Sequence, residues 1–384
     1  ARMMMMGSYF MKGTPFKDVY IHPLVRDEKG QKMSKSKGNI IDPLELLDKY
    51  GADTLRFTLT ALLNPGRDVK LAETRVKGYK SFTNKIWNAS NFLEINNCKI
   101  NDNFNILAIQ TPINQWLLNE LAQTKNNISK YMSKYLFHEV ANEIYHFVWN
   151  TYCDWYIEFA KSLFSEDSEK SQETKSTAFW VFREILKLSH PVMPFITEKL
   201  WNKMYNKSSF LMNEVCKDIS IQEKFNTSQK SFKDLIQIVI SIRNLRSELN
   251  ISYKDKIILN IINDNEKFIL FIKNLENQII KLLKLESLLI NDRSITSHGS
   301  ANIISSSSTL IVPLKGIIDT NKEIEKLNTK KNKEVVILKQ LENKLNNINF
   351  IDKAPESIIL QFKKQVKEVK SSIVKIDQII NTIN

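Results

Sequence analysis

Residues 30–47, GQKMSKSKGNIIDPLELL, are the most informative part of this 384-residue chain. Three lysines and two serines stand between Gly30 and Gly38, two residues that allow a loop to reverse direction and to change shape. A lysine cluster in a basic protein is usually a solvated loop. The ordered string KMSKS at residues 32–36 is a more specific signal than a lysine cluster in arbitrary order, so it calls for an explanation beyond solubility.

The flanking residues predict a defined structural setting for this loop. Residues 18–25, DVYIHPLV, alternate and are rich in β-branched residues, so they predict a strand. Asp42 and Pro43 are typical of an N-cap and a first helical position, and Gly51 is typical of a helix end. The predicted order is therefore strand, turn, loop and capped helix.

The composition indicates a globular protein with a polyanionic partner. Hydrophobic residues make up 42% and charged residues 25%, and the low content of glycine and proline favours helices. The net charge of +13 favours nucleic acid as the partner, although solubility would also explain the lysines. Cys98, Cys153 and Cys216 are too far apart for a zinc site or a disulfide framework, and no apolar run is long enough to span a membrane. We expect a reduced, cytoplasmic protein with no bound metal and no membrane contact.

Apolar periodicity predicts a helical bundle followed by a smaller mixed unit. Three- and four-residue spacing predicts helices over residues 52–63, 71–93, 112–130, 137–164, 178–204 and 232–249. Residues 165–176 are expected to form a solvated connector. Residues 253–316 combine short β-branched runs with one helix near residues 266–283, which predicts a small α+β unit.

The C-terminal residues predict an antiparallel coiled-coil hairpin. Residues 317–348 follow one heptad frame, apart from Lys331 and Glu334 at seam positions, and residues 362–383 carry apolar side chains three and four apart. The interruption at residues 352–355 predicts the turn. Such a hairpin can serve as an arm for a partner or for nucleic acid, or it can fold back on the body of the protein.

Several blocks of sequence carry a family resemblance. The string KMSKS resembles the second signature of class I aminoacyl-tRNA synthetases, and residues 19–47, 51–71, 78–92, 147–161 and 190–201 are similar, in the same order, to the valyl-tRNA synthetase branch. Isoleucyl and leucyl relatives share the loop. The stretch NPGRDVKL at residues 64–71 and the terminal hairpin favour the valyl branch.

The resemblance implies a mostly α fold with five parts. These are a C-terminal remnant of a class-I Rossmann-like catalytic domain that carries the KMSKS loop (1–41), a stem-contact helical region (42–104), an anticodon-binding helical bundle (105–252), a small α+β linker domain (253–316) and a tRNA-binding coiled-coil arm (317–384).

The resemblance also assigns roles to the loop. Lys35 first and Lys32 second are the implied catalytic residues, because mobile ammonium groups stabilise the charge that grows on departing pyrophosphate. The implied ATP-binding residues are Lys32, Met33, Ser34, Lys35 and Ser36, and Mg²⁺ arrives with the ATP. Met33 is expected to anchor the loop in an apolar pocket.

For tRNA, the resemblance points to the bundle and the arm. The aromatic residues Trp149, Tyr152, Trp155 and Tyr156 are suited to stacking on an anticodon base, but their helical spacing favours the alternative that they fill the bundle core. Arg243 and Arg246 are placed either for phosphates or on a solvated face. The implied backbone contacts of the arm come from Lys330, Lys331, Lys363 and Lys367.

None of the five histidines lies in the His-x-x-His signature that begins the class I nucleotide fold, and Pro23 stands where relatives usually have glycine. We therefore expect the C-terminal portion of a longer, monomeric enzyme that is inactive by itself. Its expected partners are tRNA-Val, ATP, valine and the N-terminal catalytic and editing portion of the same enzyme. The alternatives are a non-catalytic tRNA-binding module, a structural coiled-coil protein, and an isoleucyl or leucyl sister enzyme.

Overall fold

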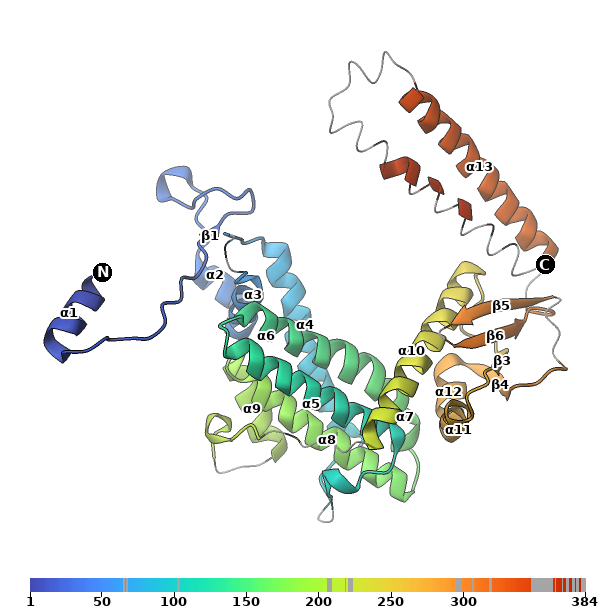
Figure 1. Ribbon diagram of the computed structural model, residues 1–384, viewed down its shortest axis with the longest axis horizontal. Helices are drawn as coiled ribbons and strands as arrows, with labels where there is room; N and C mark the ends of the chain where they lie inside the picture. Colours follow the sequence, from blue (N-terminus) through green and yellow to red (C-terminus); the bar gives the residue numbers. More distant parts are fainter. Residues whose placement is uncertain are drawn as a thin grey trace. The chain divides into compact units, whose positions relative to one another are not determined.

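The structure is a computed structural model that describes most of the chain. It describes residues 1–384 except 65, 67, 102–103, 206–208, 218, 220–223, 295–298, 306, 318–319, 347–361, 363, 368, 371–372, 375–376, 378–379 and 381–384, and it describes only the backbone at 35, 224–228, 320–323, 326–327, 330 and 346. The described residues are mainly helical, which confirms the predicted fold class, and they fall into two compact units, residues 1–229 and 230–384 (Figure 1).

The first unit begins with helix α1 (Arg2–Met11), followed by strand β1 (Val25–Arg26), which pairs in parallel with β2 (Val69–Lys70). The strand predicted over residues 18–25 is wrong except for its last residue, since residues 18–24 are not in a strand. Its partner β2 is only two residues long, and within the described chain its hydrogen bonds extend back only to Leu24, whose carbonyl accepts from the N–H of Val69 at 2.8 Å. Apolar side chains further back, such as Ile21 at 84% exposure, have no strand partner among the described residues.

Helices α2 (Pro43–Tyr50) and α3 (Ala52–Leu62) follow the lysine loop, as predicted. The Asp42 carboxylate accepts a hydrogen bond from the backbone N–H of Leu44 at 2.8 Å, which confirms the N-cap. Gly51 separates the two helices at φ +87°, a conformation that a residue with a Cβ rarely adopts.

The bundle of the first unit consists of α4 (Glu73–Ile95), α5 (Pro112–Met132), α6 (Phe137–His146), the π-helix η3 (Phe147–Tyr156), α7 (Ile157–Phe164), α8 (Glu169–Ser189) and α9 (Pro194–Tyr205). Short 3-10 helices lie at η2 (Ile106–Ala108) and η4 (Leu211–Asn213). Figure 1 shows α5, α6 and α8 side by side, and their facing residues form the buried core. The predicted bundle is thus present, with π geometry where one continuous α-helix was expected.

Two predicted boundaries in the bundle are wrong. Residues 169–176 belong to α8 rather than to a solvated connector, because Ser168 caps the helix and the buried Tyr156 hydroxyl donates to the carbonyl of Thr174 at 3.2 Å. The helix predicted over 178–204 is interrupted at residues 190–193, where Pro191 and Pro194 prevent a continuous backbone hydrogen-bond ladder.

The second unit contains a small α+β module, as predicted, together with most of helix α10 (Lys224–Glu248), which the sequence analysis assigned to the bundle. The module consists of β3 (Ile257–Ile262), α11 (Glu266–Asn274), α12 (Glu276–Leu283), β4 (Leu285–Ile290), β5 (Ser300–Ser305) and β6 (Ser308–Pro313). The sheet has the order β4-β3-β6-β5, with β3 and β4 parallel and the other pairs antiparallel. The helix expected near 266–283 is broken at Leu275 into α11 and α12.

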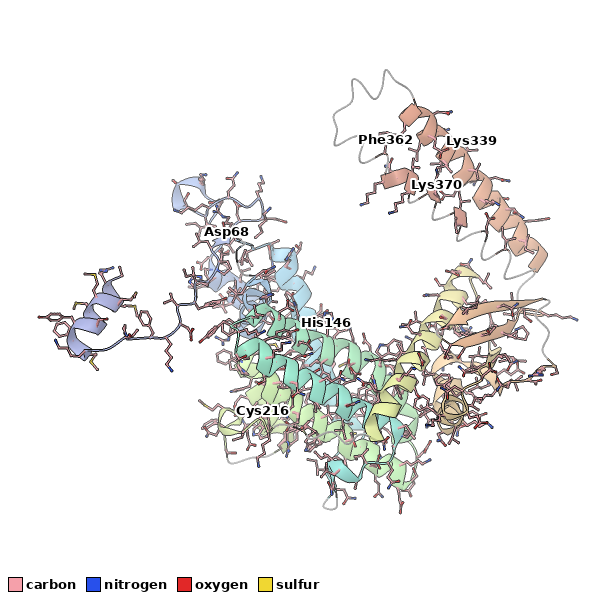
Figure 2. All side chains as sticks on the ribbon, in the orientation of Figure 1. Asp68, His146, Cys216, Lys339, Phe362 and Lys370 are labelled. Carbon is pink, nitrogen blue, oxygen red and sulfur yellow. The ribbon has the colours of Figure 1, made fainter. Side chains whose placement is uncertain are left out.

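Helix α13 (Thr320–Asn346) and helical residues between 362 and 380 form the terminal pair. The Lys344 ammonium lies 5.4 Å from the Phe362 ring centroid, and the Lys331 ammonium lies 2.5 Å from a carboxylate oxygen of Asp377. Residue numbers on the two segments run in opposite directions along these contacts, so the pair is antiparallel (Figure 2, where Phe362 and Lys370 are labelled). The predicted turn at 352–355 lies outside the described residues, and the five-part division of the chain stays a prediction.

Candidate functional site

The frame of the lysine loop is a tight turn next to β1. The backbone N–H of Gly30 donates to the carbonyl of Asp27 at 2.9 Å, and the N–H of Asp27 donates to the carbonyl of Gln31 at 3.0 Å. Gly30 and Gly38 both have positive φ, at +80° and +62°. The loop therefore leaves and returns at positions where glycine is required, as the sequence indicated.

The side chain of Asn39 connects the two ends of this loop. Its Oδ1 accepts a hydrogen bond from the backbone N–H of Ser34 at 3.0 Å, while its Nδ2 donates to the Asp27 carboxylate at 2.8 Å and to the Lys32 carbonyl at 3.3 Å. The other Asp27 oxygen accepts from the N–H of Gln31 at 2.6 Å. We call the Asp27–Asn39 pair the clasp. The sequence analysis missed this pair. The only sequence signal for it was a carboxylate before the lysine string, Asp27, and a side-chain amide directly after Gly38, Asn39.

Hydrogen bonds at the clasp also affect ionisation. The pKa of Asp27 lies below its ordinary value, first because the Asn39 amide donates to the carboxylate and second because the Gln31 N–H does so. At neutral pH, Asp27 is therefore a carboxylate that only accepts hydrogen bonds.

Met33 anchors the middle of the loop. Its half-buried side chain packs against an apolar cluster of Leu46, Tyr50, Leu55, Leu71 and Val76, which come from α2, α3, α4 and the residue after β2. The predicted anchoring role of Met33 is therefore confirmed. Because the loop is held at Met33 and at the clasp, its cationic residues project from a fixed base.

The remaining residues of the KMSKS string lie around this anchored part of the loop. Lys32 is exposed, and its backbone forms an isolated β-bridge with Arg26. Lys35 begins the 3-10 helix η1 (Lys35–Lys37), and its side chain lies outside the described atoms. The hydroxyl oxygens of Ser34 and Ser36 lie 3.2 Å apart. The exposed side chains of Lys32 and Lys37 on this base are chemically suited to a polyanion such as a triphosphate.

The aromatic cluster of the bundle is mainly a core feature. Tyr152 and Tyr156 are fully buried, and their hydroxyls donate to the Ala178 carbonyl and to Asn114 Oδ1, both at 2.9 Å. For these two tyrosines the core-filling alternative is therefore confirmed. Trp155 is half-buried and stacks on Phe159 with 6.4 Å between ring centroids.

Trp149 is also half-buried in the bundle. It stacks on Tyr145 with 5.5 Å between centroids, and the Lys85 ammonium lies 5.0 Å from the Trp149 ring centroid. Trp149 and Trp155 are both only partly buried, so stacking of either ring on a base stays a prediction.

Arg246 is a correction to the predicted phosphate contacts. Its side chain is 2% exposed, and its guanidinium donates to the carbonyls of Ser252, Asp255, Leu283 and Lys284 at 3.0–3.2 Å. It therefore joins α10 to the α+β module and cannot reach a phosphate. Arg243, one turn earlier, is half-buried.

The lysines of the terminal hairpin differ in whether they are exposed or already paired. Lys331 is half-buried and paired with Asp377, which explains a lysine at a seam position. Lys367 is exposed. The side chain of Lys330 and all of Lys363 lie outside the described atoms.

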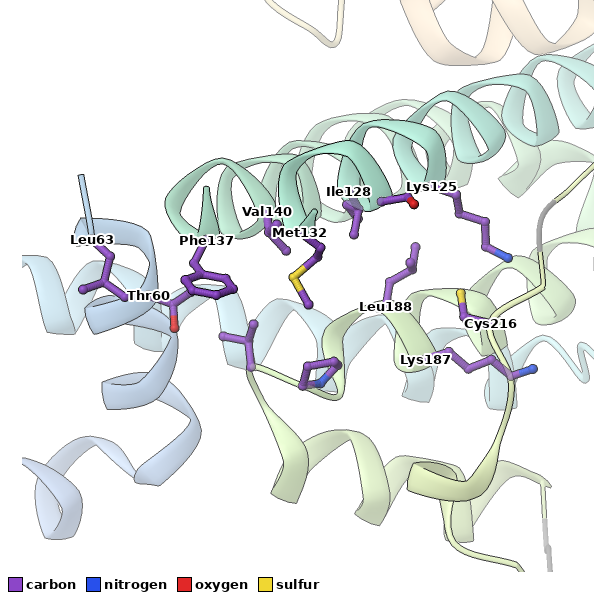
Figure 3. Close-up of a pocket in the computed structure, with 13 residues that line it drawn as sticks. Thr60, Leu63, Lys125, Ile128, Met132, Phe137, Val140, Lys187, Leu188 and Cys216 are labelled. Carbon is purple, nitrogen blue, oxygen red and sulfur yellow. The ribbon is translucent and has the colours of Figure 1, made fainter. Parts of the chain in front are cut away.

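A cavity lies inside the first unit (Figure 3). It is a cavity of about 450 Å³ between α3, α5, α6 and α8, lined by apolar residues such as Met132, Phe137 and Leu188 and ended by Lys125 and Lys187. Lys125 bonds Glu184 at 2.6 Å and the Lys217 carbonyl at 2.7 Å, and Lys187 lies 3.3 Å from Glu184. Both cations are thus already neutralised by the protein.

Among the described residues, no group of three or more histidine, cysteine, aspartate or glutamate side chains is arranged to hold a metal ion. Within the same part of the chain, none of the helices combines the length and the apolar character that crossing a membrane requires.

Comparison with known families assigns two regions of the chain. Residues 1–72 match the family described as tRNA synthetases class I (I, L, M and V), and residues 114–262 match the anticodon-binding domain of tRNA ligase. The first region contains the lysine loop, and the second contains most of the bundle, α10 and β3.

Whole-chain relatives agree with this assignment. The chain is 41% identical to the valine–tRNA ligase of Pelagibacter ubique and 37% identical to that of Desulfotalea psychrophila, in each case over 98% of this chain and 43% of the relative. It is 35% identical to the valine–tRNA ligase of Aquifex aeolicus over 100% of this chain and 34% of the relative. The chain therefore spans less than half the length of these relatives.

Among solved structures, the ternary complex of Agrobacterium radiobacter K84 agnB2 LeuRS-tRNA-LeuAMS matches with a TM-score of 0.45 and 14% identity, over 75% of this chain and 35% of that one.

Proposed function

Since this chain belongs to the valine–tRNA ligase family of class I tRNA synthetases and corresponds to a C-terminal portion of its relatives, we propose that it supplies the KMSKS loop and the tRNA-binding parts of an ATP-dependent valine–tRNA ligase. The observation that carries this proposal is the KMSKS string on a loop anchored by Met33 and closed by the clasp.

The loop would act during activation of valine. The valine carboxylate attacks the α-phosphorus of ATP, the bond to the bridging oxygen breaks, and pyrophosphate leaves with its Mg²⁺. Negative charge grows on the departing group, so the ammonium groups of Lys35 and Lys32 stabilise the transition state more than the ground state. The fixed base matters because such groups are effective only when they are held in place.

The bundle and hairpin would bind tRNA-Val. Support comes from the anticodon-binding match over residues 114–262 and from the net charge of +13. The exposed Lys367 is suited to a phosphate contact, whereas Lys331 is already paired within the hairpin.

Activation would also need the rest of the ligase. The chain spans only 43% of the valine–tRNA ligases of Pelagibacter ubique and Desulfotalea psychrophila. Large apolar side chains of α1, such as Met3 and Met11, are 75% and 80% exposed. An exposed apolar helix fits a surface that another segment of the same enzyme covers. The chain by itself is therefore expected to bind tRNA but not to exchange pyrophosphate into ATP.

The test of the catalytic proposal is Lys35→Ala in the complete ligase. We expect pyrophosphate exchange to slow by about 100-fold, which corresponds to roughly 3 kcal/mol of lost transition-state stabilisation. Affinity for tRNA-Val should stay unchanged, and Lys254→Met, which alters an exposed cation far along the sequence, is the control. A normal exchange rate in Lys35→Ala would contradict the proposal.

The tRNA proposal is tested through salt dependence. Deletion of residues 320–384 should weaken tRNA binding and flatten its dependence on salt, and Lys367→Gln should lower the slope of log K against log salt by about 1. Lys331→Gln should change the slope less, because Asp377 already pairs with this lysine. A deletion that leaves the slope intact would remove the hairpin from the tRNA interface.

A further inference from the structure

We infer that Asp27 and Asn39 are positioning residues for the reaction, a clasp that sets where the loop presents Lys32 and Lys35. This inference rests on the proposed function, because it concerns how the same loop meets the triphosphate.

The clasp acts on the backbone directly beside the two lysines. Asn39 Nδ2 donates to the carbonyl of Lys32 itself at 3.3 Å, and Asn39 Oδ1 accepts from the N–H of Ser34, the residue that precedes Lys35, at 3.0 Å. One side chain therefore fixes the peptide groups on both sides of Met33. Rotation of this amide would move both lysines together.

Asp27 determines the orientation of the Asn39 side-chain amide. A carboxylate accepts hydrogen bonds and cannot donate them, so the amide must turn its NH₂ group toward Asp27. The amide oxygen then necessarily faces the N–H of Ser34. The 2.8 Å contact between Asp27 and Asn39 therefore orders the whole network, while the 2.6 Å bond from the Gln31 N–H holds the carboxylate itself.

The clasp also works with the Met33 anchor. The packing of Met33 on the apolar cluster fixes the depth of the loop, and the clasp fixes the direction of the peptides next to it. Positive φ at Gly38 brings the chain back so that Asn39 can reach both partners. The backbone from which Lys32 and Lys35 extend is therefore fixed, and a fixed origin favours catalysis by oriented charge.

The variants that test the clasp exchange the carboxylate of Asp27 and the amide of Asn39. Asn39→Asp removes the NH₂ donor and sets two carboxylates against each other, while it keeps the acceptor for the Ser34 N–H. The double variant Asp27→Asn with Asn39→Asp restores a donor–acceptor pair with its direction reversed. It retains acceptors for the N–H groups of Gln31 and Ser34 and loses only the longest bond, to the Lys32 carbonyl.

Pyrophosphate exchange in the complete ligase is the first measurement. For Asn39→Asp we expect kcat to fall by about 100-fold, the cost of displacing a catalytic group by roughly 1 Å, with the KM for valine unchanged. The double variant should recover to within about tenfold of the unaltered enzyme. Asn126→Asp, at an exposed position on α5, is the matched control and should have full activity.

The second measurement is amide hydrogen exchange of the chain itself. In Asn39→Asp the two facing carboxylates repel each other and move apart, so the N–H groups of Gln31 and Ser34 should lose protection although their acceptors are still present. Both groups should regain protection in the double variant. Full activity of Asn39→Asp, or restored amide protection without restored kcat, would overturn the positioning role. If the unaltered complete ligase fails to exchange pyrophosphate, the proposed function is wrong. Whatever the activity, unchanged amide protection in Asn39→Asp would show that the clasp does not hold the loop.

Discussion

Replacing Arg246 by methionine should destabilise the second unit without touching a tRNA contact. The guanidinium is buried and donates hydrogen bonds to four backbone carbonyls. The bond to the carbonyl of Leu283 is itself fully buried. At about 1 kcal/mol for each net hydrogen bond, less a contribution from the apolar replacement, the expected loss of unfolding free energy is about 3 kcal/mol. The exposed cation Lys254 lies in the same unit, and Lys254→Met should cost less than about 0.5 kcal/mol.

Spectroscopy can separate the two units in a single urea titration. All six tryptophans lie at or before residue 201, within the first unit, so tryptophan fluorescence follows that unit while circular dichroism follows both. For Arg246→Met, the dichroism change should begin at lower urea, whereas the fluorescence midpoint should stay where it is. Unchanged stability together with weaker tRNA binding would refute the structural assignment and restore Arg246 as a phosphate contact.

Three further predictions concern the first unit. Met33→Ala should lower its unfolding free energy by about 1 kcal/mol, since half a side chain's packing is lost, whereas Met33→Leu should cost less; urea titration by fluorescence decides, and equal costs would contradict the anchor. Lys125→Met should cost about 3 kcal/mol because it leaves Glu184 buried beside fewer cations, and the double variant with Glu184→Leu should cost less than the sum of the single variants; additive costs would show that the pair is not coupled. Because the pKa of Asp27 is lowered in the folded chain, the clasp should be intact above its ordinary pKa of 3.8 and open only as pH falls through the lowered value; loss of Gln31 amide protection already at pH 5 would disagree.

Features determined by neighbouring residues could be predicted from the sequence. The cap at Asp42, the break at Gly51 and the amphipathic helices α4 and α5 all follow from spacing and cap chemistry within one or two turns. The anchoring of Met33 was also predictable, because a single apolar residue among lysines and serines has few other roles.

Features that depend on distant residues could not be predicted in this way. The partners of Arg246 lie up to 38 positions away, at Leu283 and Lys284, and only the fold brings them together. The start of α8 looked solvated because it is rich in serine, glutamate and lysine. Its small polar side chains at Ser171, Thr174 and Ser176 are nevertheless buried, and the Tyr156 hydroxyl donates to the carbonyl of Thr174. The residues before β1 have strand composition, but a strand also needs a partner of matching length.

The clasp was missed for a related reason. Asp27 and Asn39 are each ordinary turn residues, and their significance depends on the reversal that places them 2.8 Å apart across the loop. The signature string itself stands out in the sequence, whereas the side chains that hold it do not.

The π-helix between α6 and α7 limits how the length of this chain can change without disturbing the bundle. An α-helix rotates by about 100° per residue, whereas turns closed by i→i+5 bonds rotate less, so Phe147–Tyr156 resets the angular phase between the two helices. Removing one residue from this stretch would turn α7 by roughly 100° and carry Phe159 and Leu163 out of the interior. The packing of α7 therefore fixes the number of residues in this stretch.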